Sequence, residues 1–378
     1  MRIYKKAILP IAFKANGAAC GIRKLNRLDL ALFYSSLPAR ASCQFTTNKI
    51  PAAPIQVNKE HLKKNKFFQA IIVNSGNANC FTGSLGLEDA AKLSKDLARA
   101  LGIKKEGVLV ASTGIIAKRL PAQKISKAIP GLIAGLSLKG IHKAKLAIMT
   151  TDAFAKEIAV KCNIGKKTIT ICGVAKGAGM IAPDMATMLC FILTDANITQ
   201  GALNKALGMA VKNSFNCITV DGCMSTNDSV MVLANAAAGN ALIARGKNYN
   251  LFTGALELIC LELAKMIVKD AEGASKFIQI KVKRAKNYQE AKKAALSIAN
   301  SNLFKAAIYG ENPNFGRIVA SLGASGAEVK EKDLKIKVSP LNKKEVNVEV
   351  SINRGNSSAT VYTSDLTPEY IKINAEYS

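Results

Sequence analysis

Short apolar runs that end in Gly, Asn or Ser alternate along this chain with longer stretches rich in Ala, Leu and Lys. Runs with β-branched residues predict strands at 70–74, 108–111, 168–176 and 277–282. Apolar positions at helical spacing predict helices at 87–101, 201–213, 255–269 and 289–300. Strands and helices intermixed in this way predict an α/β protein, with sheet packed on sheet and helices outside.

The sequence pattern changes after Lys276. The helix predicted at 289–300 is followed by segments in which apolar and polar residues alternate, as in β-strands, up to the C-terminus. We therefore predict two domains, a sandwich over 1–275 and a smaller α+β domain over 276–378.

Composition is ordinary for a globular protein of 378 residues, with 49% hydrophobic and 21% charged residues. The charge is not ordinary, because 53 Lys+Arg against 26 Asp+Glu give +27, which raises the question of a nucleic-acid or membrane partner. The lysines, however, are spread in ones and twos, without an RNP-type aromatic box or zinc-finger spacing. The longest weakly polar stretch, 230–244, is too short to span a bilayer. We therefore predict neither partner.

Nine cysteines form no CxxC pair, which argues against a disulfide framework and a zinc site. We expect most of them to be buried thiols in a reducing compartment. Lys14 interrupts the first apolar run too early for a secretory signal, so a cytoplasmic protein is expected.

Only two histidines are present, His61 and His142, and both lie among charged or loop-like neighbours that predict solvated positions. This argues against a Ser-His-Asp triad and against a histidine metal site. If the protein is a covalent catalyst, its base must be another group. An N-terminal threonine is one solution, because its own α-amine, with a pKa near ~8, can accept the hydroxyl proton.

The segment 176–191 offers a place where internal cleavage could create such a threonine. A Gly-rich turn and Pro183 precede Ala186 and Thr187, and an apolar strand follows. This arrangement could strain the Ala186–Thr187 peptide bond and expose its carbonyl to the Thr187 hydroxyl. A plain loop entering a buried strand has the same composition and is more common, so composition alone favours the plain loop.

The same segment resembles the cleavage-site signature KGxGMIxPxMATML of the ornithine acetyltransferase (glutamate N-acetyltransferase) family. Seven more runs resemble that family in the same order along the chain: 73–79, 112–116, 150–152, 218–222 with 225–228, 270–274, 310–317 and 372–377. Eight collinear runs are far more specific than any one of them.

The resemblance implies acetyl transfer from N2-acetylornithine to L-glutamate in arginine biosynthesis, and in bifunctional members also from acetyl-CoA, with no cofactor. It implies cleavage into chains of residues 1–186 and 187–378, assembled as a heterotetramer with two copies of each. The implied fold is a layered αββα-type sandwich like those of N-terminal-nucleophile and aminopeptidase proteins, with a smaller α+β domain.

The resemblance also assigns residues. Thr187 would be the nucleophile of a ping-pong mechanism through an acetyl-threonine. Thr113 and Gly114 would stabilise the oxyanion. Substrate binding would fall to Lys176, Glu272, Asn374 and Ser378, besides Thr187. Each has an ordinary structural alternative: a strand-end turn, a surface lysine, a helix-end carboxylate or a turn asparagine.

The chain departs from the family pattern at a few positions. Ala153 stands where the family usually has Thr, and Asp184 replaces a common Asn beside the cleavage site. Ala178 replaces Ser between two glycines, and Cys223 replaces a common Asp. These changes leave the nucleophile in place.

Two other functions remain compatible with the sequence. One is an aminopeptidase or amidase on the same self-cleaving fold, whose nucleophile is usually Ser rather than Thr. The other is a basic binding protein without catalysis, which would bind nucleic acid in a salt-sensitive way.

Overall fold

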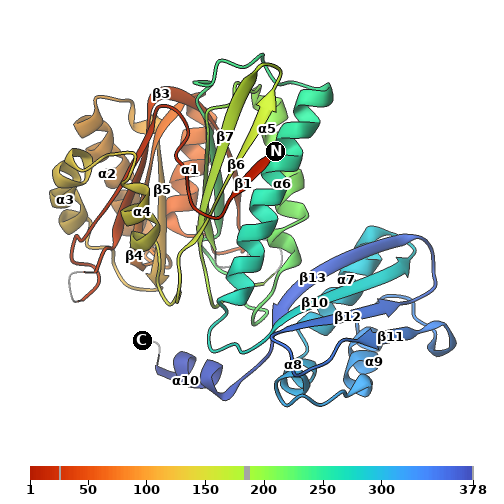
Figure 1. Cartoon of the computed structure of the whole chain (residues 1–378). Helices are drawn as coiled ribbons and strands as arrows, with labels where there is room; N and C mark the ends of the chain where they lie inside the picture. Colours follow the sequence, from red (N-terminus) through yellow and green to blue (C-terminus); the bar gives the residue numbers. More distant parts are fainter. Residues whose placement is uncertain (25–26, 183–187, 377–378) are drawn as a thin grey trace.

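The larger of two sheets forms the body of the molecule in the computed structural model, which describes residues 1–24, 27–182 and 188–376 (Figure 1). Among these residues it has nine strands in the order β1-β6-β7-β8-β9-β3-β4-β5, with β2 beside β3. Its strands are β1 (Arg2–Tyr4), β2 (Phe13–Ala18), β3 (Leu30–Phe45), β4 (Phe68–Asn77), β5 (Val108–Ile115), β6 (Lys156–Ile164), β7 (Lys167–Lys176), β8 (Leu189–Thr194) and β9 (Ser229–Ala234).

Strand β3 turns this sheet into two facing layers. Its first part pairs with β4 and its last part, from Arg40, pairs with β9, with a shift in register between Tyr34 and Ala39. The two layers share one apolar core, in which the rings of Phe33 and Phe191 stack with centroids 5.1 Å apart. Sheet therefore packs on sheet, as predicted.

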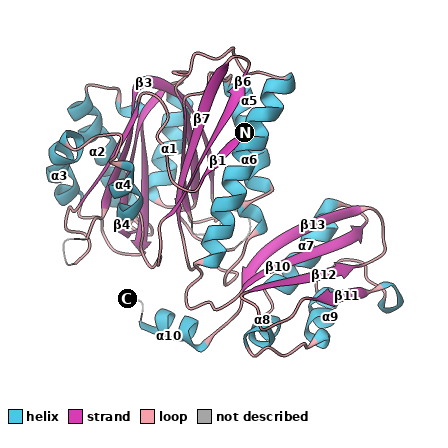
Figure 2. Ribbon diagram, in the orientation of Figure 1, coloured by secondary structure: helices cyan, strands magenta, loops and turns pink. Residues whose placement is uncertain are grey.

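Helices cover the outer faces of both layers (Figures 1 and 2). The layer of β2–β5 is covered by α1 (Ala53–Lys64), α2 (Gly83–Leu101) and α3 (Ala122–Ala134), and the other layer by α5 (Gln200–Lys212) and α6 (Gly246–Lys269). A short helix, α4 (Ile141–Ala147), packs against β2, β3 and β7. Two 3-10 turns, Lys105–Gly107 and Phe215–Cys217, precede β5 and follow α5. The predicted layered α/β architecture is confirmed.

A second, smaller sheet follows, with the strand order β11-β12-β10-β13 and its own apolar core. Its elements are β10 (Phe277–Ala285), α7 (Tyr288–Ala299), α8 (Asn302–Tyr309), α9 (Phe315–Ala324), a 3-10 turn (Glu331–Asp333), β11 (Lys335–Val338), β12 (Glu345–Ser351) and β13 (Ser357–Ser364). The last helix, α10 (Pro368–Glu376), leaves this sheet and returns toward the larger one (Figure 1). The division into domains at residue 276 stays a prediction, and Tyr362 of β13 also forms a bridge to Ile218.

The predicted strands and helices are all present, but α6 begins at Gly246, nine residues before its predicted start. The prediction for His61 was wrong. Its side chain is buried and its Nδ1 lies 2.8 Å from the Val108 carbonyl oxygen. The face of α1 that carries His61 and Asn58 packs against β5, which the charged neighbours in the sequence conceal. His142 is exposed, as expected.

All nine cysteines are free thiols, and six of them are buried, as expected for most of them. In the part of the chain that the structure describes, none of the helices combines the length and apolar character that crossing a bilayer requires.

Candidate active site

Thr113 and Gly114 lie where β5 ends beside the parallel strand β4. Gly114 has φ +132°, and a Cβ there would lie 2.3 Å from the carbonyl carbon of Gly76, with which it pairs. Only glycine fits so close an approach of two backbones. The Thr113 side chain beside it is buried but lines a cavity.

Lys176 is the last residue of β7 and lines the same cavity. Its Nζ donates to Thr150 Oγ1 at 2.7 Å and to Thr113 Oγ1 at 3.3 Å. An ammonium group can only donate, so the Thr113 hydroxyl accepts here and keeps its own proton for another acceptor. Lys176 thereby orients Thr113 as a hydrogen-bond donor.

Asp152 holds this arrangement in place. Its Oδ2 accepts from the Thr150 N–H at 2.9 Å and lies 3.9 Å from Lys176 Nζ, while its Oδ1 accepts from the Gly177 N–H at 2.7 Å. Burial acts to raise the pKa of Asp152, but Lys176, Lys156 and the Gly177 N–H together outweigh it, so this pKa lies well below its usual range. The carboxylate is therefore charged throughout the neutral range.

A second buried lysine completes the network. Lys156 is fully buried and its Nζ contacts Asp152 at 2.7 Å and Asp270. Two ammonium groups thus face two carboxylates away from solvent, an arrangement in which each charge depends on its partners. Burial lowers the pKa of Lys176, and the nearby Asp152 partly offsets this shift.

Glu272 and Asn374 close the cavity from elements far along the chain. Asn374 of α10 donates through Nδ2 to Glu272 Oε2 at 3.0 Å. The backbone N–H of Glu272 donates to the Ala178 carbonyl at 3.0 Å. The Glu272 carboxylate lies over Gly179, where a Cβ would be 2.2 Å from Oε2. This close approach explains why the second glycine of the Gly-Ala-Gly turn is needed.

The cavity itself has a volume of about 100 Å³, below the ~300 Å³ typical for drug-sized ligands, and so suits a small polar metabolite. It brings together five of the predicted residues: Thr113, Gly114, Lys176, Glu272 and Asn374. Also lining it are Ala78, Ile116, Thr150, Thr151, Gly179, Met180, Ser225 and Asn227. Ala186, Thr187 and Ser378 were predicted as well, and they lie outside the residues that the structure describes.

Two carboxyl groups anchor the described residues on either side of 183–187. Asp221 accepts from the N–H groups of Met180 and Ile181 at 2.7 and 2.9 Å. Asp228 Oδ1 accepts from the Met188 N–H at 2.8 Å. Met188 is the covalent neighbour of Thr187, so the anchor at Asp228 acts next to the predicted nucleophile.

Sequence reasoning gave Asp228 no role, although it lies in a run that matched the family. Its side chain is completely buried, and its Oδ2 has no hydrogen-bond partner among the residues described. Burial raises the pKa of this carboxyl well above its ordinary value, against the opposing effects of the Met188 N–H and Lys176. The sequence signal that could have revealed this role is an acidic residue directly before the apolar strand β9.

Across the described residues, 1–24, 27–182 and 188–376, His, Cys, Asp and Glu side chains form no group of three that could hold a metal ion. The polar side chains that line the cavity are those of Lys176 and Glu272, with hydroxyl and amide groups around them.

The fold is that of a mixed α/β protein with a two-layered sheet. The cavity lies where strands of that sheet end, and buried, paired charges surround it. Together these features define the class of the protein. Within that class the chain belongs to the ArgJ family, whose family model matches residues 14–378. This confirms the resemblance seen in the sequence.

The chain is similar to individual proteins and solved structures to different degrees. The arginine biosynthesis bifunctional protein ArgJ of Caldanaerobacter subterraneus is 44% identical over 397 aligned positions, covering 98% of this chain and 98% of that protein. The structure of the Mycobacterium tuberculosis ornithine acetyltransferase complexed with ornithine is 35% identical, with a TM-score of 0.45, covering 48% of this chain and 97% of that one. An L-aminopeptidase from Ochrobactrum anthropi, described as a variant of the Ntn-hydrolase fold, matches 71% of this chain and 89% of its own, at 10% identity and a TM-score of 0.42.

Proposed function

We propose that this protein transfers an acetyl group from N2-acetylornithine to L-glutamate in arginine biosynthesis, after cleaving its own chain between Ala186 and Thr187. The observation that carries the proposal is the meeting of Thr113, Lys176 and Glu272 in one small cavity. The names of the relatives, a bifunctional protein of arginine biosynthesis and an ornithine acetyltransferase, point to the same reaction.

Opposite charges in the cavity match an amino-acid substrate. Lys176 is suited to bind the α-carboxylate of acetylornithine, because it carries a buried ammonium directed into the cavity. Glu272, oriented by Asn374, is suited to bind the side-chain amine of ornithine. The two groups would fix the acetyl amide between them, and a substrate held in one orientation reacts faster.

Thr187 would supply the nucleophile and the base. Its Oγ attacks the acetyl carbonyl while its α-amine takes the hydroxyl proton, and the collapse of the tetrahedral adduct breaks the amide C–N bond. The α-amine then protonates the departing nitrogen of ornithine. In the second half-reaction the amine of glutamate attacks the acetyl ester, and Thr187 Oγ leaves with a proton.

Thr113 and Gly114 would stabilise the oxygen anion of both tetrahedral intermediates. The support is geometric: Lys176 donates to Thr113 Oγ1, which leaves the hydroxyl proton of Thr113 available to the substrate oxygen. Removing one such donor typically costs ~10²–10³-fold in kcat.

Acetyl-CoA as a second acetyl donor, assembly into two copies of each chain and a cytoplasmic location belong to the same proposal. The word bifunctional in the relatives' names supports the second donor. Nine free thiols support a reducing compartment.

The proposal is tested by mass spectrometry under denaturing conditions on the freshly purified protein and on Thr187→Ala. We expect chains of 186 and 378 − 186 = 192 residues for the natural protein and one chain of 378 for the variant. Thr168→Ala is the matched control, because it removes an exposed threonine hydroxyl from β7, and it should be cleaved normally.

The cleaved protein is then assayed for acetyl transfer from N2-acetylornithine to glutamate. Transfer that disappears in Thr187→Ala supports the acetyl-threonine mechanism. Hydrolysis of aminoacyl amides without transfer would contradict it, and so would an uncleaved natural protein that still transfers acetyl groups.

A further inference from the structure

A buried lysine of α8, Lys305, has no part in the cavity described above. Its residue is 3% exposed, and its ammonium donates to the backbone carbonyl of Val220, 85 residues earlier in the chain. Burial lowers the pKa of Lys305 to about 8, against the opposing charges of Asp221 and Asp365. Burying an ammonium group is costly, so the contact with Val220 calls for an explanation.

The sequence of α8 explains why this lysine faces away from the core of the smaller sheet. Phe304 and Ile308, one helical turn apart, pack into that core. Lys305 follows Phe304 by one residue, which turns its side chain by about 100° around the helix axis. Figure 1 shows α8 near the junction of the two sheets, where Lys305 meets the segment 218–221.

The same segment has further contacts with the chain around the smaller sheet. The N–H of Thr219 donates to the carbonyl of Tyr362 in β13 at 3.0 Å, and its Oγ1 donates to Asn300 Oδ1 at 2.6 Å. Val220, the next residue, accepts from Lys305. Lys305 is the one charged donor among these contacts, and charge-assisted hydrogen bonds are about twice as strong as neutral ones.

The segment 218–221 in turn holds residues that precede the predicted cleavage site. Val220 accepts from Lys305 through its carbonyl and donates through its N–H to the Ile181 carbonyl at 2.8 Å. Asp221 accepts from the N–H groups of Met180 and Ile181. Met180 has φ +57°, in the left-handed region that residues with a Cβ seldom adopt. Such a conformation persists only where its surroundings fix it, and here the segment 218–221 does so.

We propose that Lys305 is a positioning residue for self-cleavage, which acts through Val220 and Asp221 on the turn at 180–181. The inference rests on the proposed function, because it assigns a supporting residue to the cleavage between Ala186 and Thr187. It makes the smaller sheet a participant in the maturation of an active site that the larger sheet carries.

Self-cleavage has water as its only co-reactant. Thr187 Oγ forms a bond to the carbonyl carbon of Ala186, the C–N bond breaks, and the nitrogen takes up the proton of the hydroxyl. Water then hydrolyses the ester, which leaves the Ala186 carboxylate and the free Thr187 hydroxyl. A misplacement of about 1 Å between reacting groups costs roughly 10²-fold in rate. A looser turn upstream therefore slows the cleavage even where the fold persists.

The test follows cleavage over time after cell-free synthesis of the full chain, for the natural protein and for Lys305→Met. Mass spectrometry under denaturing conditions gives the fraction of uncleaved chain at each time. Loss of one charge-assisted hydrogen bond should slow the cleavage of Lys305→Met by roughly tenfold or more. A natural rate in Lys305→Met would overturn the proposal.

Lys276→Met is the matched control. The side chain of Lys276 is 9% exposed, and it donates to the carbonyl of Leu341 at 2.6 Å and to Glu311 at 2.8 Å. Both partners belong to the chain around the smaller sheet, so this variant loses a comparable lysine without touching 218–221, and its cleavage should stay close to the natural rate. Equal slowing in both variants would show that loss of stability is responsible and would overturn the role of Lys305.

Urea unfolding in a Thr187→Ala background checks that the lysine variants fold. If Lys305→Met shows no cooperative transition, Lys305→Gln takes its place, because it keeps a neutral N–H donor. It should slow cleavage by roughly threefold, and a natural rate in this variant would overturn the proposal.

The pH dependence of cleavage separates a charged donor from a group that only fills space. Near pH 8 Lys305 loses its proton, so the advantage of the natural protein over Lys305→Met should shrink from pH 7 to pH 9. Asp221 and Asp365 are the acidic groups that act on Lys305. Tyr370 and Cys223 contact Asp221, and burial raises the pKa of both above its ordinary value, so neither titrates near pH 8. A constant ratio of the two rates would contradict the proposed role.

The same time course distinguishes this inference from the proposed function. If the natural protein stays uncleaved, self-cleavage fails as a proposal and the role of Lys305 fails with it. If the natural protein and Lys305→Met are cleaved equally fast, self-cleavage stands and only the role of Lys305 is wrong.

Discussion

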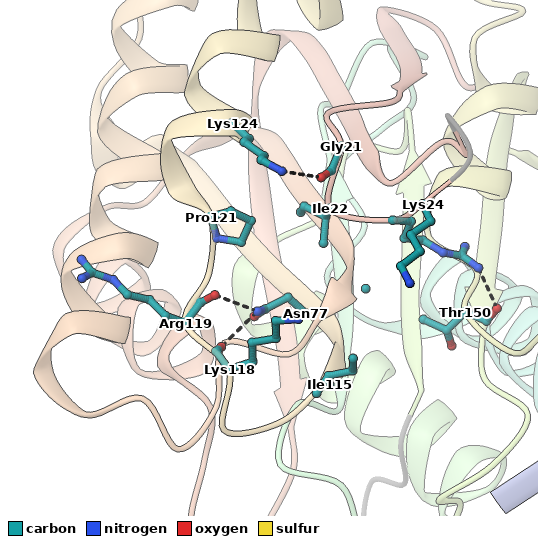
Figure 3. A pocket seen from close by; sticks show the side chains of 12 residues that line it. Gly21, Ile22, Lys24, Asn77, Ile115, Lys118, Arg119, Pro121, Lys124 and Thr150 are labelled. Atoms are coloured by element: carbon teal, nitrogen blue, oxygen red, sulfur yellow. Dashed lines mark hydrogen bonds between the residues drawn. The ribbon is translucent and has the colours of Figure 1, made fainter. Parts of the chain in front are cut away.

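Two cavities share the lining residue Thr150: the small one of Lys176 and a larger one, of about 570 Å³, which is also lined by Lys24, Lys118 and Lys124 (Figure 3). The two differ in how their charged side chains are paired and exposed. Lys176 lines the smaller cavity, and Lys156 shares with it the partner Asp152; both lysines are buried and face carboxylates. In the larger one Lys24, Lys118 and Lys124 are exposed and share the cavity with no acidic lining residue in the part of the chain described. A buried charge is costly unless it is paired, whereas solvent and salt screen like charges at the surface.

This contrast shows how little the net charge of +27 says about individual lysines. Lys156 and Lys176 have fixed partners and fixed geometry, so Lys176 can orient reacting groups in the smaller cavity. The lysines of the larger cavity keep water around them, so they can attract and release a mobile anion. The four predictions that follow probe this difference.

Lys156→Met should produce the largest effect, because it leaves Asp152 and Asp270 without their common buried partner. Breaking a buried ion pair costs about 3–5 kcal/mol of unfolding free energy. The measurement is urea unfolding in a Thr187→Ala background, so that a single chain unfolds. Lys118→Met, in the larger cavity, serves as the comparison. If it lowered the unfolding free energy as much as Lys156→Met does, the buried and the exposed lysines would not differ in the way described.

Gly179→Ala should disturb the smaller cavity by steric overlap, since its Cβ would lie 2.2 Å from Glu272 Oε2. Displacement of that carboxylate should raise KM for acetylornithine by roughly tenfold. Steady-state kinetics measures this. Gly208→Ala in α5, whose Cβ would meet no atom within 4 Å, should behave like the natural protein, and equal KM values for all three would exclude a role for the Glu272 position.

Asp228→Asn should change how stability depends on pH. The pKa of Asp228 in the folded protein lies well above that of the unfolded chain, near ~3.9. Between these two values the folded state holds a proton that the unfolded state has lost, so unfolding free energy falls as pH rises, by up to about 1.4 kcal/mol per pH unit. Asparagine can keep the bond to the Met188 N–H without titrating.

Relative to Thr187→Ala alone, the combined Asp228→Asn/Thr187→Ala protein should therefore gain stability steadily from about pH 4 to neutral pH. Urea unfolding at a series of pH values measures the difference. Parallel curves for the two proteins would mean that Asp228 is ionised in the folded state.

Added salt should produce the smallest change, a change in ligand affinity. It distinguishes the exposed charges of the larger cavity from the buried charges of the smaller one most directly. Raising NaCl from about 0.05 M to about 0.5 M should weaken the binding of inorganic phosphate by roughly fivefold, because the exposed cations of the larger cavity become screened. The affinity for ornithine, which binds among buried charges, should fall by less than about twofold over the same salt range. Titrations of both ligands over the salt series measure this, and equal slopes would argue against the different solvation of the two cavities.

Much of the fold could be predicted from local patterns. The predicted strand 70–74 is apolar up to Asn74, the strand 108–111 is apolar throughout, and Thr113 and Gly114 lie two and three residues after its end. Lys176, Glu272 and Asn374 were found through family signatures, which carry information about long-range contacts that a local pattern lacks.

Other features could not be predicted because their cause lies far away in the chain. Lys156 resembles any surface lysine until Asp270, 114 residues later, is placed beside it. His61 is buried by β5 rather than by its own charged neighbours. The larger cavity combines residues near 21, 77 and 119, which the pairing of β3 with β4 and of β4 with β5 brings together.

The strand order has a mechanical consequence for a protein cut before residue 187. In the order β7-β8-β9-β3, strands 189–194 and 229–234 of the second piece lie between strands 167–176 and 30–45 of the first. The two pieces would be interleaved, so hydrolysis of one peptide bond could not release either without tearing the sheet. Reassembly from fully unfolded pieces would be a bimolecular reaction, limited by concentration. Folding would then have to come first and cleavage second, which makes a native sheet the precondition for creating the nucleophile.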